Sequence, residues 1–149
     1  MGLIIRSSAI HAAGCYTTAP VPTGTRIMEY DGPRLSKDDA DRRYEERSLT
    51  YLFGLGDGAR VIDGHCMAMF LNHSCDPNCE TDEVRGHIYI ASIRDIAAGE
   101  ELTYDYNLYD GEGDELCNCG APSCRGQMFS PDEIARRERK RKKAEVKRR

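Results

Sequence analysis

The pattern of apolar and polar positions predicts a chain built mainly from short strands. Segments rich in β-branched and aromatic residues, each bounded by Gly, Pro or Asp, recur through the first two thirds of the sequence. They are residues 3–6, 25–30, 51–55, 60–63, 87–93 and 101–104. A mainly β fold is therefore expected.

Two helices are predicted from their N-terminal signals. The first spans about residues 37–47, with Ser36 as the N-cap and acidic residues in the first turn. The second opens at residues 130–133 (Ser-Pro-Asp-Glu), which have capping-box spacing with proline at the first helical position. It should run into the basic tail and fray, because like charges four residues apart repel. Residues 110–115 lack core-forming side chains and predict a mobile loop.

Length and hydropathy limit the class of protein. The 149 residues suffice for one domain with its own core. No apolar run approaches the roughly 18 residues of a membrane span, and the N-terminus does not read as a secretory signal. We therefore expect an intracellular protein that does not enter a membrane. It would be cytoplasmic in a bacterium, and nuclear if it acts in a eukaryotic cell, whether encoded there, by a virus or delivered to a host.

Charge is distributed unevenly along the chain. The net charge is −4, yet residues 131–149 hold ten Lys and Arg against four acidic residues. The preceding residues are strongly acidic, which favours a Lys/Arg-rich protein partner, whereas a basic arm favours an anionic one. Two interpretations of the tail stay open: nucleic-acid contact through residues 136–149, or a solvated helix that aids solubility. Nothing in the sequence indicates an oligomeric state.

The cysteines predict a zinc site. Seven cysteines fit a disulfide framework poorly. Cys117, Cys119 and Cys124 form a C-x-C-x4-C cluster, and three thiolates leave one tetrahedral zinc position open. Cys75 is the candidate for that position. The remaining three are predicted to be buried free thiols, typical of a reducing compartment; they are Cys15, Cys66 and Cys79.

Several motifs together resemble the SET-domain protein lysine methyltransferases that carry a post-SET zinc segment. They are Asn72-His73-Ser74-Cys75-Asp76-Pro77-Asn78, Gly99-Glu100-Glu101-Leu102-Thr103-Tyr104-Asp105-Tyr106, and the cysteine cluster ending in Cys124-Arg125-Gly126. Upstream, residues 24–32 resemble the strand of that family that carries a tyrosine and a glycine, and residues 39–43 resemble its short insert helix. The resemblance covers about residues 3–129. Each motif alone is weak, but their order and spacing are specific.

The resemblance implies a fold that periodicity does not reveal. This is the SET-domain (β-clip) arrangement of small sheets, in which a C-terminal segment forms a pseudoknot. The pseudoknot would bring residues 72–75 beside residues 104–106. We expect a SET domain over residues 1–109, a post-SET zinc segment over 110–129 and a basic helical tail over 130–149.

The resemblance also implies a reaction, methyl transfer from S-adenosylmethionine to a lysine of a histone-like or other basic protein. It gives Tyr106 the catalytic role and places Tyr30 in the lysine channel. Tyr104 takes the position that restricts the product, so monomethylation or dimethylation is expected. Tyrosines suit such a channel because they offer an apolar wall with a polar tip.

The implied cofactor site departs from the family pattern. The residues that would bind S-adenosylmethionine are Gly14, Asn72, His73, Tyr106 and Met128. The usual Gly-x-Gly reads Ala12-Ala13-Gly14 here, and alanine does not easily adopt a positive φ. Met69 replaces a common arginine, and Gln127 replaces an aromatic residue, whose place Met128 or Phe129 would take.

These departures leave a second class of function open. In this alternative the chain is a catalytically inactive, zinc-containing SET-like module that binds basic proteins or nucleic acid. Such a module would not need Tyr30, Tyr106 and the Asn72-His73 pair together. Binding of S-adenosylmethionine separates the two alternatives.

Overall fold

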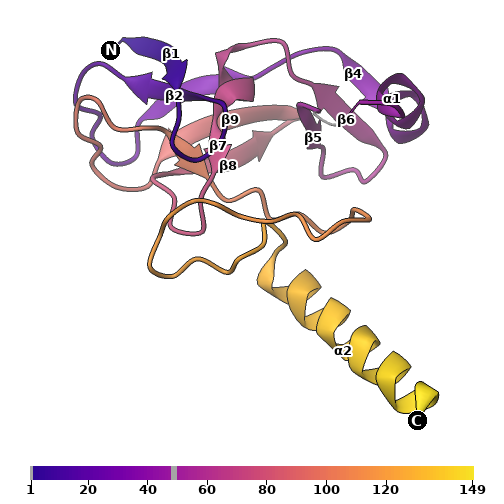
Figure 1. Cartoon of the computed structure of the whole chain (residues 1–149). Coiled ribbons are helices and arrows are strands. Elements are labelled where there is room, and N and C mark those ends of the chain that lie inside the picture. Colours follow the sequence, from indigo (N-terminus) through magenta and orange to yellow (C-terminus); the bar gives the residue numbers. More distant parts are fainter. Residues whose placement is uncertain (1, 48–49) are drawn as a thin grey trace.

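The computed structural model describes residues 2–47 and 50–149. Short strands form a β-rich body, and one long helix projects from it and ends at the C-terminus (Figure 1). The predicted mainly β fold is confirmed. Within the described residues, no helix is both long enough and apolar enough to cross a membrane.

Two antiparallel sheets build one half of the body. The hairpin of β1 (Leu3–Ser7) and β2 (Ala13–Thr17) forms the first. The second has the order β3 (Arg26–Tyr30), β9 (His87–Ser92), β8 (Cys79–Val84). In β9, the fully buried Ile88 and Ile90 alternate with more exposed residues, because successive side chains of a strand point to opposite faces.

A third antiparallel sheet lies beside the first helix. Its order is β4 (Arg34–Ser36), β6 (Arg60–Asp63), β5 (Leu52–Gly54), and α1 (Lys37–Tyr44) follows β4 directly. The Ser36 hydroxyl accepts a hydrogen bond of 3.1 Å from the Asp39 N–H, as its N-cap position predicts. The helix ends three residues before its expected end.

The smallest sheet brings together two segments that lie about 30 residues apart in the sequence. After the 3-10 turn η1 (Met67–Phe70), β7 (Asn72–His73) pairs in parallel with β10 (Thr103–Tyr104). The Asn78 side chain secures this pairing, since it donates to the Glu101 carbonyl (2.7 Å) and accepts from the Thr103 N–H (2.9 Å). The expected juxtaposition of residues 72–75 with 104–106 is confirmed.

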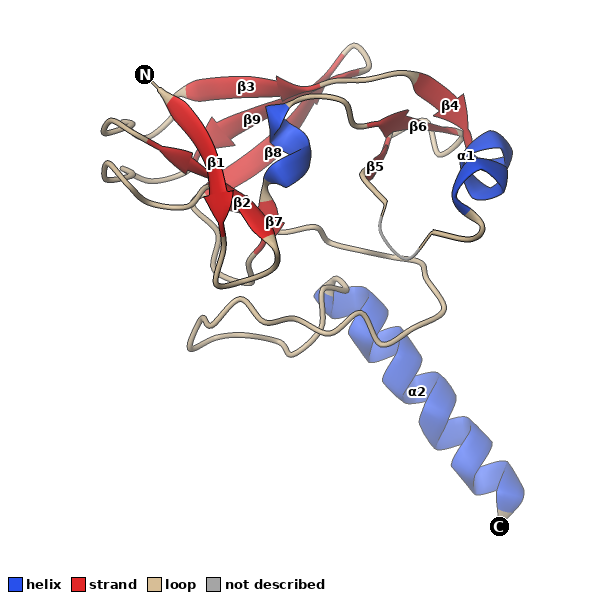
Figure 2. Ribbon diagram, turned by 45° about the horizontal axis from the view of Figure 1, so that its top comes forward, coloured by secondary structure: helices blue, strands red, loops and turns tan. Residues whose placement is uncertain are grey.

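The second helix, α2 (Pro131–Arg148), extends away from the body in both views (Figures 1 and 2). The Ser130 hydroxyl accepts from the Glu133 N–H at 3.2 Å, which is half of the expected capping box. The other half is replaced. The Ser130 N–H donates to the Leu108 carbonyl, and the Glu133 carboxylate accepts hydrogen bonds from Arg136 and Arg137.

Candidate functional site

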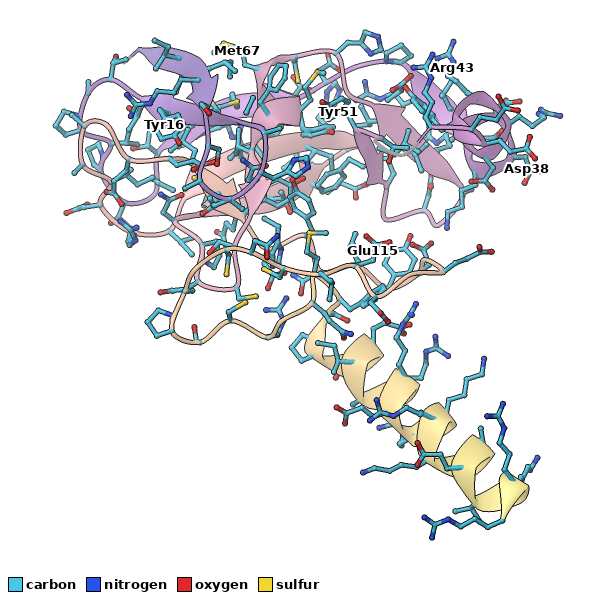
Figure 3. All side chains as sticks on the ribbon, viewed as in Figure 1. Tyr16, Asp38, Arg43, Tyr51, Met67 and Glu115 are labelled. Atoms are coloured by element: carbon cyan, nitrogen blue, oxygen red, sulfur yellow. The ribbon has the colours of Figure 1, made fainter. Side chains whose placement is uncertain are left out.

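Two cavities meet inside the β-rich body. Their volumes are about 430 and 390 Å³, and four residues line both: Thr50, Tyr51, Met69 and Tyr106. Tyr51 lies within the body, above the loop that carries Glu115 (Figure 3). A group held in one cavity can therefore face a group held in the other, with Tyr106 between them.

Aromatic rings form the walls of the first cavity, which we call the aromatic channel. The rings of Tyr104 and Tyr106 are 4.8 Å apart between centroids, and Phe53 lies 5.3 Å from Tyr30 and 6.2 Å from Tyr104. All three tyrosines singled out in the sequence line this one channel. Its walls suit an extended apolar chain that ends in a polar group.

The three tyrosine hydroxyls have different partners. Tyr106 donates to the Leu71 carbonyl and Tyr30 to the Tyr51 carbonyl, both at 2.6 Å. Within the described part of the chain, the Tyr104 hydroxyl makes no hydrogen bond with the protein. Burial raises the pKa of all three hydroxyls above the usual range for tyrosine, so they stay neutral and can donate hydrogen bonds.

Gly64 does not line the channel but lies against two residues that do, Tyr30 and Tyr51, and the sequence did not reveal it. A Cβ at this position would lie 2.7 Å from the Tyr30 hydroxyl and 3.0 Å from the Tyr51 carbonyl. The Gly64 N–H also donates to the same Tyr51 carbonyl. Only glycine therefore leaves room for the hydrogen bond that positions Tyr30.

The second cavity combines apolar side chains with polar groups. Its apolar lining comes from Ile10, Met69, Phe70, Leu116 and Met128. The remaining lining residues are 11–13, Thr50, Tyr51, Asn72, His73, Tyr106, Glu115, Cys117 and Asn118. The segments come from the N-terminal loop, from β7 and from the C-terminal cysteine region, so the cavity exists only when all three assemble.

Asn72 fixes the N-terminal loop of this cavity. Its side-chain N–H₂ group donates to the Glu101 carboxylate at 2.8 Å and to the Ala13 carbonyl at 3.0 Å. The Ser8 hydroxyl also contacts the Glu101 carboxylate, at 2.8 and 2.9 Å. Glu101 is thus a positioning residue that the sequence motif contained but that received no role.

In the Ala-Ala-Gly segment, Ala12 and not Gly14 lines the cavity and has the positive φ. Gly14 is not among the residues that line the cavity, and a Cβ there would lie 2.2 Å from a Glu101 carboxylate oxygen. Ala12 does line it and has a φ of 37°, in the left-handed region. That conformation costs a residue with a Cβ about 1 kcal/mol. The loop therefore adopts a glycine-like conformation in spite of Ala12.

His73 connects this cavity to the cysteine cluster. Its Nδ1 accepts a hydrogen bond of 3.0 Å from the Tyr106 backbone N–H, and its Nε2 lies 3.3 Å from the Cys75 sulfur. Burial lowers the pKa of His73 to about 4, so the ring is neutral at physiological pH. Since Nδ1 is an acceptor, the single proton sits on Nε2, toward Cys75.

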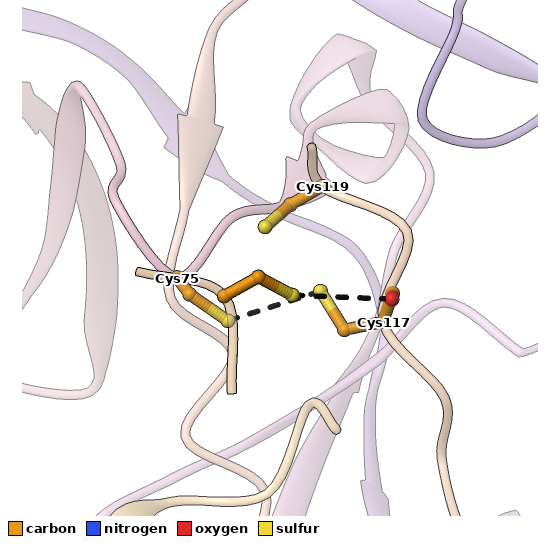
Figure 4. A group of neighbouring side chains, drawn as sticks. Cys75, Cys117 and Cys119 are labelled. Carbon is orange, nitrogen blue, oxygen red and sulfur yellow. Dashed lines mark hydrogen bonds between the residues drawn. The ribbon is translucent and has the colours of Figure 1, made fainter. Parts of the chain in front are cut away.

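The four predicted zinc ligands lie together. The sulfurs of Cys75, Cys117, Cys119 and Cys124 all lie within 4.8 Å of one another. Three of these side chains are seen converging in Figure 4, and the Cys75 and Cys117 sulfurs are 3.8 Å apart. Tetrahedral zinc with Zn–S bonds of about 2.3 Å requires sulfurs about 3.8 Å apart. The donor set and its spacing therefore fit zinc.

Two further contacts support a thiolate cluster. The backbone N–H groups of Arg125 and Gly126 point at the sulfurs of Cys75 and Cys124, at 3.4 and 3.3 Å. The Arg125 guanidinium makes a bidentate pair with Asp105 at 2.8 and 2.9 Å, which ties the cluster to the end of β10. Burial opposes the charge of Asp105, but Arg125 holds its pKa below the usual range.

The other cysteines follow the sequence prediction with one correction. None of the seven forms a disulfide in the described residues. Cys15 and Cys79 are fully buried, but Cys66 is only partly buried. Its sulfur accepts from the Asp31 N–H at 3.2 Å, at the edge of the core, so the prediction of a buried thiol was wrong there.

Comparison with known proteins decides the family. The sequence model described as SET domain matches residues 12–107. The chain belongs to the SET-domain family. The parallel β7–β10 contact and the three tyrosines lie within the matched region, whereas the second cavity also takes residues 115–118 and Met128 from beyond it.

Curated relatives of this SET domain are larger proteins. Histone-lysine N-methyltransferases specific for H3 lysine-4 from Eremothecium gossypii and Saccharomyces cerevisiae are each 41% identical over 80% of the chain. The histone-lysine N-methyltransferase ATX2 of Arabidopsis thaliana is 38% identical over 83%. The alignments span only 14%, 12% and 13% of these relatives, respectively.

The remaining departures from the SET-domain pattern also have positions in the structure. Met69, in place of the common arginine, lines both cavities. Of the two candidates to replace the aromatic residue at Gln127, Met128 lines the second cavity. Phe129 is fully buried, 3.9 Å beneath the Arg137 guanidinium, and is not part of that lining.

Proposed function

We propose that this chain is a protein-lysine N-methyltransferase that uses S-adenosylmethionine. The observation that carries the proposal is the meeting of two cavities of different character at Tyr106. One has aromatic walls from several tyrosines and Phe53, and the other combines apolar walls with backbone and amide groups. Membership of the SET-domain family and the names of its relatives agree with this reaction.

In this proposal the second cavity holds the cofactor. Ala12 and Ala13 supply backbone groups beside Asn72 and His73, and Met128 supplies an apolar surface. Gly14 would contribute indirectly, because its lack of a Cβ leaves room for the Glu101 carboxylate that Asn72 binds. S-adenosylmethionine, when bound, provides an electrophilic methyl group. Tyr106, which lines both cavities, directs the lysine amine toward it.

The aromatic channel would hold the lysine side chain. The amine must lose its proton before it can attack, and a lysine in water has a pKa near 10.4. A channel that removes water lowers that pKa, because the charged form loses its solvation. The hydroxyls of Tyr30 and Tyr106 are neutral and fixed by backbone carbonyls, so they orient the amine without stabilising its ammonium form.

Tyr104 would set the number of methyl groups. Its hydroxyl has no hydrogen-bond partner in the described protein, and Tyr104 lines the channel, where a water molecule held by that hydroxyl would take up the space of an additional methyl. We propose monomethylation or dimethylation for this reason. Zinc would be bound by Cys75, Cys117, Cys119 and Cys124, and it would hold one wall of the cofactor cavity in place.

The proposed substrate is a Lys/Arg-rich protein such as a histone. Asp41 of α1 and Asp110 both line the aromatic channel, on a body with an excess of acidic residues. Basic residues on either side of the target lysine would meet these carboxylates. The enzyme would then work where such proteins bind DNA, in a nucleus or in bacterial cytoplasm.

Calorimetric binding of S-adenosylmethionine, and of its demethylated product, to zinc-loaded protein tests the proposal first. Stoichiometric binding is expected, followed by methylation of histone H3 or another basic protein that the Tyr106→Phe variant performs about 10²-fold more slowly. Absence of binding at millimolar ligand would overturn the proposed enzymatic function and favour the catalytically inactive, zinc-containing module.

A further inference from the structure

Helix α2 carries its positive charges mainly on one side. Seven basic residues recur at helical spacing and form what we call the basic stripe: Arg136, Arg137, Lys140, Arg141, Lys143, Lys147 and Arg148. Glu138 and Glu145, seven residues apart, share the opposite side. From residue 138 to the C-terminus every side chain is exposed. A helix that served only solubility would not need to segregate its charges.

The base of this helix is fastened to the body. The buried Glu133 carboxylate accepts hydrogen bonds of 2.7 Å from both Arg136 and Arg137. Arg137 also donates to the Gly111 carbonyl at 2.6 Å and to the Gly113 carbonyl at 3.3 Å. Its guanidinium stacks on the Phe129 ring at 3.9 Å. These contacts fix the direction in which α2 leaves the body.

The same contacts place the stripe beside the candidate site. The loop that Arg137 holds has Asp110 in the lining of the aromatic channel and Glu115 in that of the second cavity. Between this loop and α2 lies a groove of about 440 Å³, to which the stripe contributes Arg136, Arg137, Lys140 and Arg141. An anionic partner held at this groove would therefore lie beside the loop of residues 110–115, which contributes Asp110 to one cavity and Glu115 to the other.

We propose that the basic stripe of α2 binds the phosphate backbone of duplex DNA and so presents DNA-bound proteins to the aromatic channel. Beyond Arg136 and Arg137, which Glu133 engages, the stripe from Lys140 to Arg148 is about 12 Å long at 1.5 Å per residue, and a helix of this diameter fits the major groove of B-form DNA. The deep, narrow major groove of duplex RNA would not admit it. The acidic body repels phosphates, which confines the contact to the projecting helix.

The contact is expected to be independent of base sequence. Lysine and arginine side chains that neutralise phosphates carry affinity, whereas base edges carry specificity. The stripe consists of lysine and arginine alone, and both side chains neutralise phosphates whatever the neighbouring bases. DNA binding stands on α2 alone, while the presentation of substrate rests on the proposed methyltransferase function.

Fluorescence anisotropy of a labelled 30-base-pair duplex with the full zinc-loaded protein tests DNA binding. The stripe variant K140Q/R141Q/K147Q removes three charges from the stripe. The matched control R139Q/K142Q/R149Q removes three charges from the rest of the helix. The stripe variant should bind at least 10-fold more weakly, with a salt slope shallower by about 2 to 3, whereas the control should lose less than 3-fold.

Three outcomes would overturn the proposal. Equal weakening by both variants would mean diffuse attraction without a defined face. Equally tight binding of an RNA duplex would show that α2 does not bind in the major groove of B-form DNA. Self-association of the protein that the stripe variant abolishes, without DNA binding, would identify a second copy as the occupant.

The presentation of substrate has a separate readout. On a basic protein bound to DNA, the stripe variant should methylate at least 10-fold more slowly than the wild type, while both should act equally on the free protein. A wild type that binds DNA but methylates nothing would refute the proposed function and leave the DNA contact standing. Equal rates of the two proteins on the DNA-bound substrate would refute presentation alone.

Discussion

The backbone N–H of Tyr106 donates a hydrogen bond of 3.0 Å to Nδ1 of His73, whose Nε2 lies 3.3 Å from the Cys75 sulfur. One neutral imidazole therefore joins the tyrosine between the two cavities to a ligand of the candidate zinc site. Partners of this kind orient the groups at a metal site and those beside it. Loss of a metal from this site should consequently change the position of Tyr106.

The Cys119→Ser variant tests that connection. We expect it to lose zinc and at least 10²-fold in methyltransferase activity, because the cluster loses a thiolate and the walls from residues 115–118 lose their anchor. The strand core should survive, since it packs without these residues. Metal analysis and far-ultraviolet circular dichroism check both parts. Freshly purified, reduced wild type without zinc would refute the site.

Replacing Tyr106 by phenylalanine removes only the hydroxyl that donates to the Leu71 carbonyl. The rate should fall about 10²-fold, as expected when reacting groups are misplaced by about 1 Å. Binding of S-adenosylmethionine should change less than 3-fold, because the ring remains in the cavity lining. Single-turnover kinetics and calorimetry separate the two effects. An unchanged rate would remove Tyr106 from the mechanism.

Tyr104→Phe should change the product and leave the rate on an unmodified lysine within about 3-fold. Removal of a hydroxyl that makes no hydrogen bond with the described protein frees space in the channel at little cost to packing. Mass spectrometry of a substrate peptide should then show dimethylated and trimethylated lysine where the wild type stops earlier. The same product distribution in both proteins would contradict the assigned role.

Ala12→Gly should leave the free energy of unfolding nearly unchanged, because relief of the strain at a φ of 37°, about 1 kcal/mol, offsets the entropic cost of glycine, about 0.5 to 1 kcal/mol. Ala13→Gly is the matched control. Ala13 begins β2, where glycine should instead destabilise by about 0.5 to 1 kcal/mol. Urea denaturation of both variants gives the two values, and destabilisation by Ala12→Gly would show that the loop conformation is not strained.

Acid should weaken the attachment of α2. Hydrogen bonds from Arg136 and Arg137 lower the pKa of Glu133 to about 2, from an ordinary value of 4.5. Because the folded-state pKa is depressed, the stabilisation is complete above pH 4.5 and disappears as the pH falls toward 2. The difference in Tm between the wild type and Glu133→Gln should follow that window. Glu138→Gln, on the exposed side of α2, should show no such dependence.

Local signals made part of this architecture predictable. Ser36 and Ser130 begin helices because capping depends on a few neighbouring residues. By contrast, β7 and β10 are two-residue strands whose pairing is parallel and long-range, so no periodicity reveals them. The strand β8 was missed because its sequence, Cys-Glu-Thr-Asp-Glu-Val, is largely polar and exposed.

The candidate site shows the same limit. Cysteine spacing and family resemblance brought together Cys75, Cys117, Cys119 and Cys124, which the structure places in one cluster. The need for glycine at position 14 could not be predicted, because the Glu101 carboxylate that occupies the space of a Cβ is distant in sequence. Gly64 belongs to no recognisable motif. The need for glycine there follows only from the positions of the Tyr30 hydroxyl and the Tyr51 carbonyl in the folded chain.

The parallel contact between β7 and β10 also sets an order of events during synthesis. Asn72 and His73 leave the ribosome well before Thr103 and Tyr104, and the last three cysteines follow later still. Long-range pairings of this kind form only when their distant partner is available. A nascent chain can therefore complete its early hairpins, whereas the second cavity and the cysteine cluster cannot assemble until residues 115–128 have been synthesised.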